Sequence, residues 1–354
     1  MGGCWTFLQI LCVIASQVIA TSFGLSCNGS PQYCGLRFNQ FTFPATHNSF
    51  SRPQSTPFKL YGNKEVSDAD CYARNQGDSV TKQLKNGIRS IDIDTCGKDT
   101  FDLLEENYAI KAYTCHKVFY SDPVSSILEE IDAWMEANPN EVVVLSFTDK
   151  VQKWNNNEIA KDIKKKLEDL WAPTIERRRR RNLTLNDAFM TTGEWPTLRE
   201  AVQTNQRIFL FIHTKLTFHM GRITWAHDFT WIKQTNNNLK FQESDNCQNL
   251  IPLIDESCQT DEKLISVDMF VTRGLPVCTT ERANACNPLL SQATDRCYYQ
   301  RKEYTLTVNF LKIDFPDRNG NLGYKELKNV AQDMNERNVE SYIGITFGRY
   351  TTAK

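Results

Sequence analysis

Short apolar runs rich in β-branched and aromatic residues recur along this chain, and segments with helical spacing separate several of them. Each run ends in polar or charged residues. The expected strands are 41–46, 88–95, 109–115, 142–147, 207–213, 264–271 and 305–315, with an eighth at 221–231. Alternating strands and helices predict the α/β class. Seven or eight such strands indicate a TIM-type (β/α)8 barrel, complete or in a distorted or incomplete form.

Two segments between the expected strands carry clear helix signals. Apolar residues fall on one helical face between positions 124 and 135, in a stretch bounded by prolines, which predicts an amphipathic helix. Positions 78–86 predict another helix, which the side chain at 78 or 79 can cap and Gly87 can end.

The first twenty residues are uncharged and carry an apolar run at 5–19 that ends in Val18-Ile19-Ala20. The run is shorter than the roughly 20 residues of a membrane-spanning helix, and small or branched residues stand where signal peptidase cleaves. We therefore expect a signal peptide at 1–20, followed by a single domain at 21–354. We expect the mature protein to be secreted to the extracellular space, because no later stretch is apolar enough to span a membrane.

Cysteine usage agrees with export. Removal of the signal peptide leaves ten cysteines, and an even number in an exported chain indicates disulfides. Five precede residue 120 and five follow residue 240, so at least one bridge joins the two ends of the chain if all of them pair. A zinc site is the competing interpretation, but no Cys-x-x-Cys pair with partner histidines occurs. The ten are Cys27, Cys34, Cys71, Cys96, Cys115, Cys247, Cys258, Cys278, Cys286 and Cys297.

Two sequons and the charge balance bear on the surface. Asn28-Gly-Ser30 and Asn182-Leu-Thr184 are N-glycosylation sequons, which only the secretory route can use. The chain has 41 basic and 42 acidic residues, so no overall positive field draws nucleic acid. We expect a monomeric glycoprotein without a nucleic-acid partner.

A run of five arginines, Arg177 to Arg181, lies beside the second sequon in a segment with weak periodicity. We expect an exposed loop here. Two further interpretations stay open, namely a cleavage site for a basic-specific protease and a patch that contacts anionic membranes.

Chemically competent side chains stand at the carboxyl ends of the expected strands. In a β/α barrel these ends share one open mouth, where the loops hold the reacting groups. One such residue alone is usually structural, but several converge here, which predicts an active site at the mouth. The residues are His47, Asp92, Asp94, His116, Asp149, Lys215 and Asp314.

Four ordered motifs run through these strands. They are Phe43-Pro-Ala-Thr-His-Asn-Ser-Phe50, then Asp78-Ser-Val-Thr-Lys-Gln-Leu-Lys-Asn-Gly-Ile-Arg-Ser-Ile-Asp-Ile-Asp94, then Cys115-His116, then Glu141-Val-Val-Val-Leu-Ser146. Together they resemble the X region of phosphatidylinositol-specific phospholipase C. The nearest likeness is to the extracellular PLC-like phosphodiesterases of plants and microbes, and it runs from about Phe41 to Lys215 and more faintly to Asp314.

The resemblance implies a phosphoric diester hydrolase or lyase that uses two histidines. It implies that His47 takes the proton of the inositol 2-hydroxyl as that oxygen attacks phosphorus, and that His116 protonates the departing diacylglycerol oxygen. It further implies that Asp314 holds the His47 imidazole in its working tautomer. Lys215, after the fifth strand, is the candidate for substrate binding. The implied substrate is a phospholipid or another phosphodiester, reached by transient contact with a membrane surface.

The resemblance also implies a cation that offsets charge on the phosphate. Eukaryotic relatives hold Ca²⁺ through an Asn after the first histidine and acidic residues on the second strand, and this chain has Asn48, Asp92 and Asp94 there. Strand alternation points both carboxylates to one face, and oxygen ligands suit Ca²⁺ or Mg²⁺. The acidic ligand of the fourth strand aligns with Thr148, and Asp149 lies one position late. The metal site is therefore either incomplete or completed by a bulge that brings Asp149 inward.

Two other functions fit parts of the pattern. Sphingomyelinase D-like and glycerophosphodiester enzymes also carry acid-x-acid on the second strand and a histidine after the third, although Asn48 and the segment at 79–84 favour phospholipase C. The other alternative is a secreted lipid- or phosphodiester-binding protein that keeps the barrel and has lost turnover. The displaced fourth ligand motivates this alternative, and the two histidines argue against it. Phosphatidylinositol, a glycosyl-phosphatidylinositol anchor and a soluble phosphodiester all stay open as substrates.

Overall fold

The computed structural model describes most of the chain after the expected signal peptide. Several predictions fall outside these residues, among them the signal peptide at 1–20, the substrate-binding role of Lys215, the part of the eighth strand at 221–225, and Cys71 and Cys278. The described residues are 25–51, 59–60, 64–65, 74–102, 107–116, 119–149, 156–213, 220, 226–235, 247–259, 264–270, 279–301, 307–317 and 323–351.

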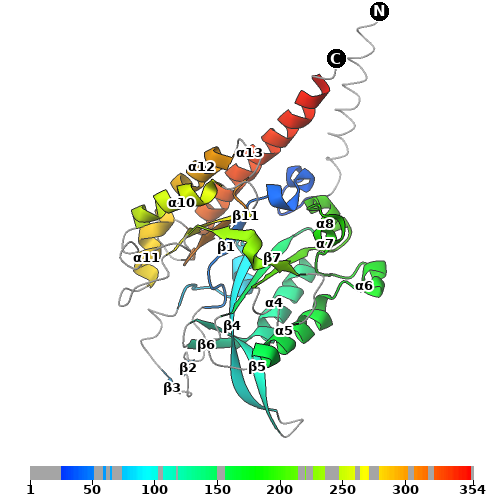
Figure 1. Ribbon diagram of the computed structural model, residues 1–354, viewed down its shortest axis with the longest axis vertical. Helices are drawn as coiled ribbons and strands as arrows, with labels where there is room; N and C mark the ends of the chain where they lie inside the picture. Colours follow the sequence, from blue (N-terminus) through cyan, green and yellow to red (C-terminus); the bar gives the residue numbers. More distant parts are fainter. Residues whose placement is uncertain are drawn as a thin grey trace, which may run out of the picture.

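A curled parallel sheet forms the centre of the molecule (Figure 1). Its strands pair in parallel in the order β10 (Ile232–Gln234), β11 (Leu264–Met269), β12 (Phe310–Ile313), β1 (Phe43–Thr46), β4 (Ser90–Asp102), β7 (Val143–Asp149), β8 (Ile208–Ile212) and β9 (His227–Asp228). The 3-10 helix η4 (Phe229–Trp231) joins β9 to β10, so both lie on one short run of chain. This confirms the prediction of a TIM-type α/β barrel in a distorted or incomplete form. Of the expected eighth strand at 221–231, residues 227–228 form β9 and 229–231 form η4, whereas β10 lies beyond its expected end.

The expected third strand, 109–115, is present, but the prediction that it belongs to the parallel barrel is wrong. β5 (Asn107–His116) pairs antiparallel with β4, from Thr95↔Thr114 to Asp102↔Asn107. β4 runs on past the barrel, and only four residues separate its end from β5. Such a connection makes a hairpin, since a parallel crossover needs a dozen or more residues. The hairpin extends away from the barrel (Figure 1).

Short antiparallel strands and a shell of helices complete the fold. β5 pairs with β6 (Phe119–Pro123), β6 with β2 (Lys59–Leu60), and β2 with β3 (Lys64–Glu65).

Within the described part of the chain, no helix combines the length and apolarity that crossing a membrane requires. The helices are α3 (Val80–Lys85), α4 (Val124–Ala137), α5 (Asn156–Trp171), α6 (Ile175–Arg180), α7 (Ala188–Thr192), α8 (Leu198–Gln203), α10 (Leu250–Cys258), α11 (Thr279–Cys286), α12 (Leu290–Arg301) and α13 (Tyr324–Thr351).

Both predicted helices are present. α4 buries the apolar face expected between positions 124 and 135, including Ile131 and Trp134. α3 covers most of 78–86, and the Ser79 side chain accepts a hydrogen bond from the backbone N–H of Lys82 at its start, as an N-cap residue does.

Strand alternation divides the barrel side chains into an outer and an inner set. The outer set, which includes Ile91 and Leu145, packs under the helices. The inner set begins with aromatic residues. Phe211 of β8 and Phe310 of β12 meet with ring centroids 6.4 Å apart although their strands are not neighbours. Further along the same strands the inner positions become polar, as at Lys312. The inner face therefore changes from aromatic to charged toward the carboxyl ends of the strands.

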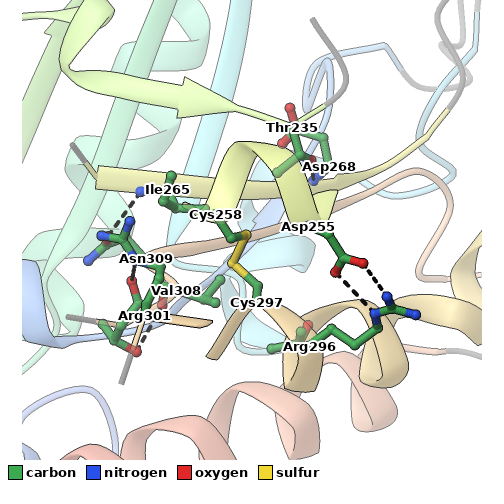
Figure 2. Close-up of a disulfide and its surroundings, with 12 residues drawn as sticks. Thr235, Asp255, Cys258, Ile265, Asp268, Arg296, Cys297, Arg301, Val308 and Asn309 are labelled. Carbon is green, nitrogen blue, oxygen red and sulfur yellow. Dashed lines mark hydrogen bonds and ion pairs between the residues drawn. A yellow bond between two sulfur atoms is a disulfide. The ribbon is translucent and has the colours of Figure 1, made fainter. Parts of the chain in front are cut away.

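Four disulfides confirm the expected cysteine chemistry within the described residues: Cys27–Cys34, Cys96–Cys115, Cys247–Cys286 and Cys258–Cys297. Cys71 and Cys278 lie outside these residues, so the bridge between the two ends of the chain stays a prediction. Figure 2 shows how Cys258 of α10 and Cys297 of α12 link the two helices, beside an ion pair between Asp255 and Arg296. Covalent and charge contacts together hold this helix pair.

The arginine run is helical and does not form the expected exposed loop. Thr174 caps α6 through its side chain, and Glu176 pairs with Arg180 one turn later, which stabilises a short helix. The helix is exposed, as predicted. Arg181 follows it, and its carbonyl accepts a hydrogen bond from the Asn205 side chain just before β8. The run therefore lies at the amino end of the strands, opposite the expected mouth.

The two sequons differ in their surroundings. Asn182 is exposed at the end of the arginine run. The Asn28 side chain instead forms two hydrogen bonds with the backbone of Val142, donating to its carbonyl and accepting from its N–H. The Asn28 amide nitrogen that a glycan would take is therefore engaged, and Asn182 is the better placed of the two.

His227 is buried among aromatic rings on the inner face. It is 1% exposed, and its ring lies 5.0 Å from Phe211 and 4.9 Å from Trp195 between centroids. Neither ring nitrogen has a hydrogen-bond partner among the described residues. Burial lowers the pKa of His227 to about 4, because the apolar surroundings disfavour the charged imidazolium.

This burial predicts a loss of stability in mild acid that His227→Phe removes. The unfolded chain binds a proton below pH about 6.5 and the folded chain only below about 4, so stability falls as the pH drops through that window. At pH about 5 the difference is worth on the order of 2 kcal/mol. Urea unfolding of the wild type and of His227→Phe, each at neutral pH and at pH about 5, measures this difference in the free energy of unfolding. Equal pH dependence in the two proteins would contradict the prediction.

Candidate active site

His47 stands at the carboxyl end of β1, where the chain turns back over the barrel. Its N–H donates to the Ile313 carbonyl at 3.1 Å, and its carbonyl accepts from the Gln76 side chain at 2.6 Å. The imidazole stacks on Phe270, with centroids 3.7 Å apart and planes 6° from parallel. The next residue, Asn48, has φ +45°, a left-handed conformation that Asn tolerates better than most residues. Backbone and ring contacts therefore fix the imidazole.

Asp314 forms a hydrogen bond with the Nδ1 atom of the His47 ring. Its Oδ1 lies 3.0 Å from His47 Nδ1, directly after β12. Burial raises the pKa of Asp314 to about 8, opposed by a hydrogen bond from Asn75. The pair can share one proton at neutral pH, with Nδ1–H donating to the carboxylate. That tautomer leaves His47 Nε2 as a base.

Asn75 joins the two halves of the site, and nothing in the sequence pattern singled it out. Its Nδ2 donates to Asp314 Oδ2 at 3.0 Å, and its Oδ1 accepts from Asn48 Nδ2 at 3.1 Å. Asn75 thus orients both the Asp314 carboxylate, which contacts His47, and the Asn48 side-chain amide, which belongs to the candidate cation site. It lies in an irregular segment before α3, where no periodicity marks a functional residue.

His116 reaches the site from the hairpin. It is the last residue of β5, and its ring centroid lies 6.5 Å from that of His47, with the planes 76° apart. The disulfide of Cys115 to Cys96 ties the end of β5 to β4. The fold thus brings together the two histidines that the sequence motifs indicated.

Asn48, Asp92 and Asp94 lie together beside the histidines. The Asn48 N–H donates to Asp92 Oδ2 at 3.5 Å, and the Thr148 hydroxyl donates to Asp94 Oδ1. Asn48 Oδ1 and Asp92 Oδ1 are buried without a hydrogen-bond partner among the described residues, and such oxygens suit a hard cation. In the described part of the chain, no three His, Cys, Asp or Glu side chains are placed so that they could hold a metal ion by themselves, so a cation here would depend on the amide oxygen as well as the two carboxylates.

The ladder between β4 and β7 is regular through Asp94↔Thr148 and Thr95↔Asp149. No bulge therefore moves Asp149 into the place of Thr148, which stands beside Asp94. The side chain of Asp149 and all of Lys215 lie outside the described residues. Their predicted roles stay predictions.

Two buried charges in the site were missed by the sequence analysis. Lys312 of β12 lies 3.6 Å from Asp92 Oδ2, and its pKa is raised because nearby carboxylates outweigh the effect of burial. Asp268 of β11 stands opposite Lys312 in the ladder. Burial raises the pKa of Asp268 to about 6, while Lys312 and a Ser266 hydrogen bond oppose the rise. Strand alternation could have revealed Lys312 as a site residue, since it lies two positions before Asp314 and therefore on the same face of the strand.

A protein-family model described as PI-PLC X 1 matches residues 66–315, more than half of the chain. The chain belongs to the PI-PLC X family. The match contains His116, Asp92, Asp94 and Asp314, whereas His47 precedes its first residue.

Two members of the PI-PLC X family share part of the sequence. PI-PLC X domain-containing protein 1 of Arthroderma benhamiae is 27% identical over 213 residues, which are 60% of this chain and 58% of that protein. PI-PLC X domain-containing protein At5g67130 of Arabidopsis thaliana is 27% identical over 180 residues, which are 50% of this chain and 36% of that protein. The matched region spans less than two thirds of either relative.

Solved structures of bacterial enzymes have the same fold. Phosphatidylinositol-specific phospholipase C from Listeria monocytogenes matches with a TM-score of 0.54 and 16% identity, over 85% of this chain and 97% of that one. The enzyme from Staphylococcus aureus, studied for its membrane binding, matches with a TM-score of 0.55 and 15% identity, over 84% of this chain and 94% of that one. At such identities the match establishes the barrel fold alone.

Asn75→Ala tests whether the hydrogen-bonded site is also a structural unit. The substitution leaves Asp314 Oδ2 and Asn48 Nδ2 without their shared partner. We expect it to lower the free energy of unfolding by about 1–3 kcal/mol, measured by urea unfolding. Gln292→Ala, at an exposed position of α12, is the control and should change it by less than about 0.5 kcal/mol. Equal unfolding midpoints would show that Asn75 is dispensable.

Proposed function

We propose that this protein is a secreted phosphoric diester hydrolase that cleaves a phosphatidylinositol-type phosphodiester by two-histidine acid–base catalysis. The observation that carries the proposal is the approach of His47 and His116 to 6.5 Å between ring centroids, with Asp314 Oδ1 3.0 Å from His47 Nδ1. Family membership supports the phosphodiesterase class, and the disulfides support export.

The proposed reaction begins with His47. Its Nε2 accepts the proton of the inositol 2-hydroxyl while that oxygen forms a bond to phosphorus, and Asp314 stabilises the imidazolium through Nδ1–H. The bond from phosphorus to the diacylglycerol oxygen breaks, and His116 gives that oxygen a proton. The products are a cyclic inositol phosphate and diacylglycerol. Hydrolysis of the cyclic phosphate uses the two histidines in reversed roles.

Asn48, Asp92 and Asp94 would hold a cation, which we propose is Ca²⁺ or Mg²⁺. When bound, it would offset negative charge on the phosphate oxygens. The residues themselves prepare this position, because Thr148 orients Asp94 and the Asn48 N–H orients Asp92. We keep Lys215 as the proposed substrate contact. The proposed cation site does not include Asp149, because the regular ladder pairs Thr148, and not Asp149, with Asp94.

The proposed setting is extracellular. We propose a monomer that carries a glycan at Asn182 and touches membranes transiently, as expected for an enzyme whose substrate is a lipid. His47 and His116 lie toward the carboxyl ends of the barrel strands, so we propose that a lipid headgroup approaches that end of the barrel.

A binding protein without turnover is the second candidate. Thr148 favours it, because a hydroxyl stands beside Asp94 where the calcium enzymes carry a carboxylate. The retained pair of histidines favours catalysis.

Phosphorus NMR of phosphatidylinositol vesicles with the purified protein tests the proposal. We expect cyclic or open inositol phosphate from the wild type. His47→Ala and His116→Ala should each lower the rate by about 100- to 10,000-fold, because each removes a general acid or base. Asp314→Asn should lower it by at least about 100-fold, because it favours the wrong tautomer of His47.

Thermal unfolding of each variant is the control for folding. Phosphatidic acid together with free inositol, which leaves the phosphate on the lipid, would point to the sphingomyelinase D-like or glycerophosphodiester class. A spectrum without product from the wild type, together with vesicle binding that His47→Ala leaves intact, would favour the binding protein.

A further inference from the structure

Lys312 places a fixed positive charge beside one of the candidate cation ligands. Its Nζ lies 3.6 Å from Asp92 Oδ2, and the side chains are 5% and 7% exposed. Water screens such a pair far less than a surface ion pair. The charge on Lys312 therefore acts strongly on whatever Asp92 binds.

Asp92 directs its two oxygens to different partners. Oδ2 meets the ammonium of Lys312 and the backbone N–H of Asn48. Oδ1 is buried without a hydrogen-bond partner among the described residues, as is the side-chain oxygen of Asn48. The Asp92 carboxylate thus contacts the Lys312 ammonium through Oδ2 and leaves Oδ1 available to a divalent cation.

A second carboxylate keeps Lys312 in place. Asp268 stands opposite it in the ladder between β11 and β12, and is fully buried. The charges of Asp92 on β4 and Asp268 on β11 both act on the ammonium of Lys312 on β12. Removal of Lys312 from this environment would leave two buried carboxylates uncompensated.

We propose that Lys312 is an internal counter-ion that competes with a divalent cation for Asp92 and thereby weakens cation binding in this site. The ammonium neutralises part of the charge that attracts the cation and repels the cation itself. The consequence for catalysis rests on the proposed function, since the cation would act at the substrate phosphate. The competition itself is a property of the binding site alone.

Calorimetric titration of CaCl₂ into the purified protein tests the competition. Lys312→Met keeps the length of the side chain and removes its charge. We expect it to bind Ca²⁺ at least about tenfold more tightly than the wild type. Lys312→Arg retains the charge, so its affinity should stay close to that of the wild type.

Two further variants keep the test decisive. Lys328→Met removes the same charge from an exposed position on α13, and its Ca²⁺ affinity should not change. If Lys312→Met does not fold, Lys312→Met combined with Asp268→Asn restores the net charge without touching Asn48, Asp92 or Asp94. This double variant should fold and should bind Ca²⁺ more tightly than Asp268→Asn alone, which loses the same carboxylate charge and keeps Lys312.

Equal or weaker Ca²⁺ affinity after loss of the Lys312 charge would overturn the inference, as would equal tightening by Lys328→Met or no heat of binding in any variant. Phosphorus NMR on the same samples separates this result from the proposed function. Tighter Ca²⁺ binding without lipid cleavage would retain the competition and reject the enzyme. Cleavage that no chelator affects, with no Ca²⁺ binding, would do the reverse.

Discussion

Buried charge on the inner face of the barrel is the constraint on which the candidate site depends. Carboxylates from three different strands lie there almost without contact to water, and an unpaired charge in such a place costs several kcal/mol. Each therefore has a partner, with Asp314 against His47, Asp92 against Lys312 and Asp268 against Ser266. Because strand register decides which of these groups meet, the same strand pairing that builds the curled sheet also orients the histidine.

The chemistry and the structural support occupy opposite ends of the barrel. At the amino ends of the strands, Arg89 pairs with Glu141, and the Asn28 side chain joins the backbone of Val142. The arginine helix α6 and Asn182 lie at this end as well. A lipid that approached the carboxyl ends would not meet these arginines, so a membrane contact through α6 would serve a purpose other than presenting substrate to His47.

Much of the barrel could be predicted because its strands are apolar runs that end in polar residues. The reversed β5 could not, because residues 96–102 contain glycine, lysine and two aspartates and do not resemble a strand. Their composition predicts a loop between two strands, whereas β4 and β5 form one long hairpin. The disulfide between Cys96 and Cys115 stabilises that hairpin, but ten cysteines do not reveal their own pairing.

The site could be predicted in part for a similar reason. His47, His116 and Asp314 stand at the ends of expected strands, where their convergence predicts an active site and the resemblance implies their roles. Asn75 lies in an irregular segment and acquires its role from the fold, through bonds to residues far away in sequence. Lys312 was visible in principle as a charge within an apolar strand, but its partner Asp92 is 220 positions away, and only the folded sheet brings the two together.

The separate roles of His47 and His116 are tested most directly by changing the leaving group. The measurement compares the wild type, His47→Ala and His116→Ala on phosphatidylinositol and on an inositol phosphodiester of 4-nitrophenol, whose leaving oxygen needs no proton. If His116 is the general acid, its loss should cost at least about 100-fold less on the nitrophenyl substrate, while the deficit of His47→Ala stays the same on both. Equal deficits of His116→Ala on the two substrates would contradict the assignment of the two histidines.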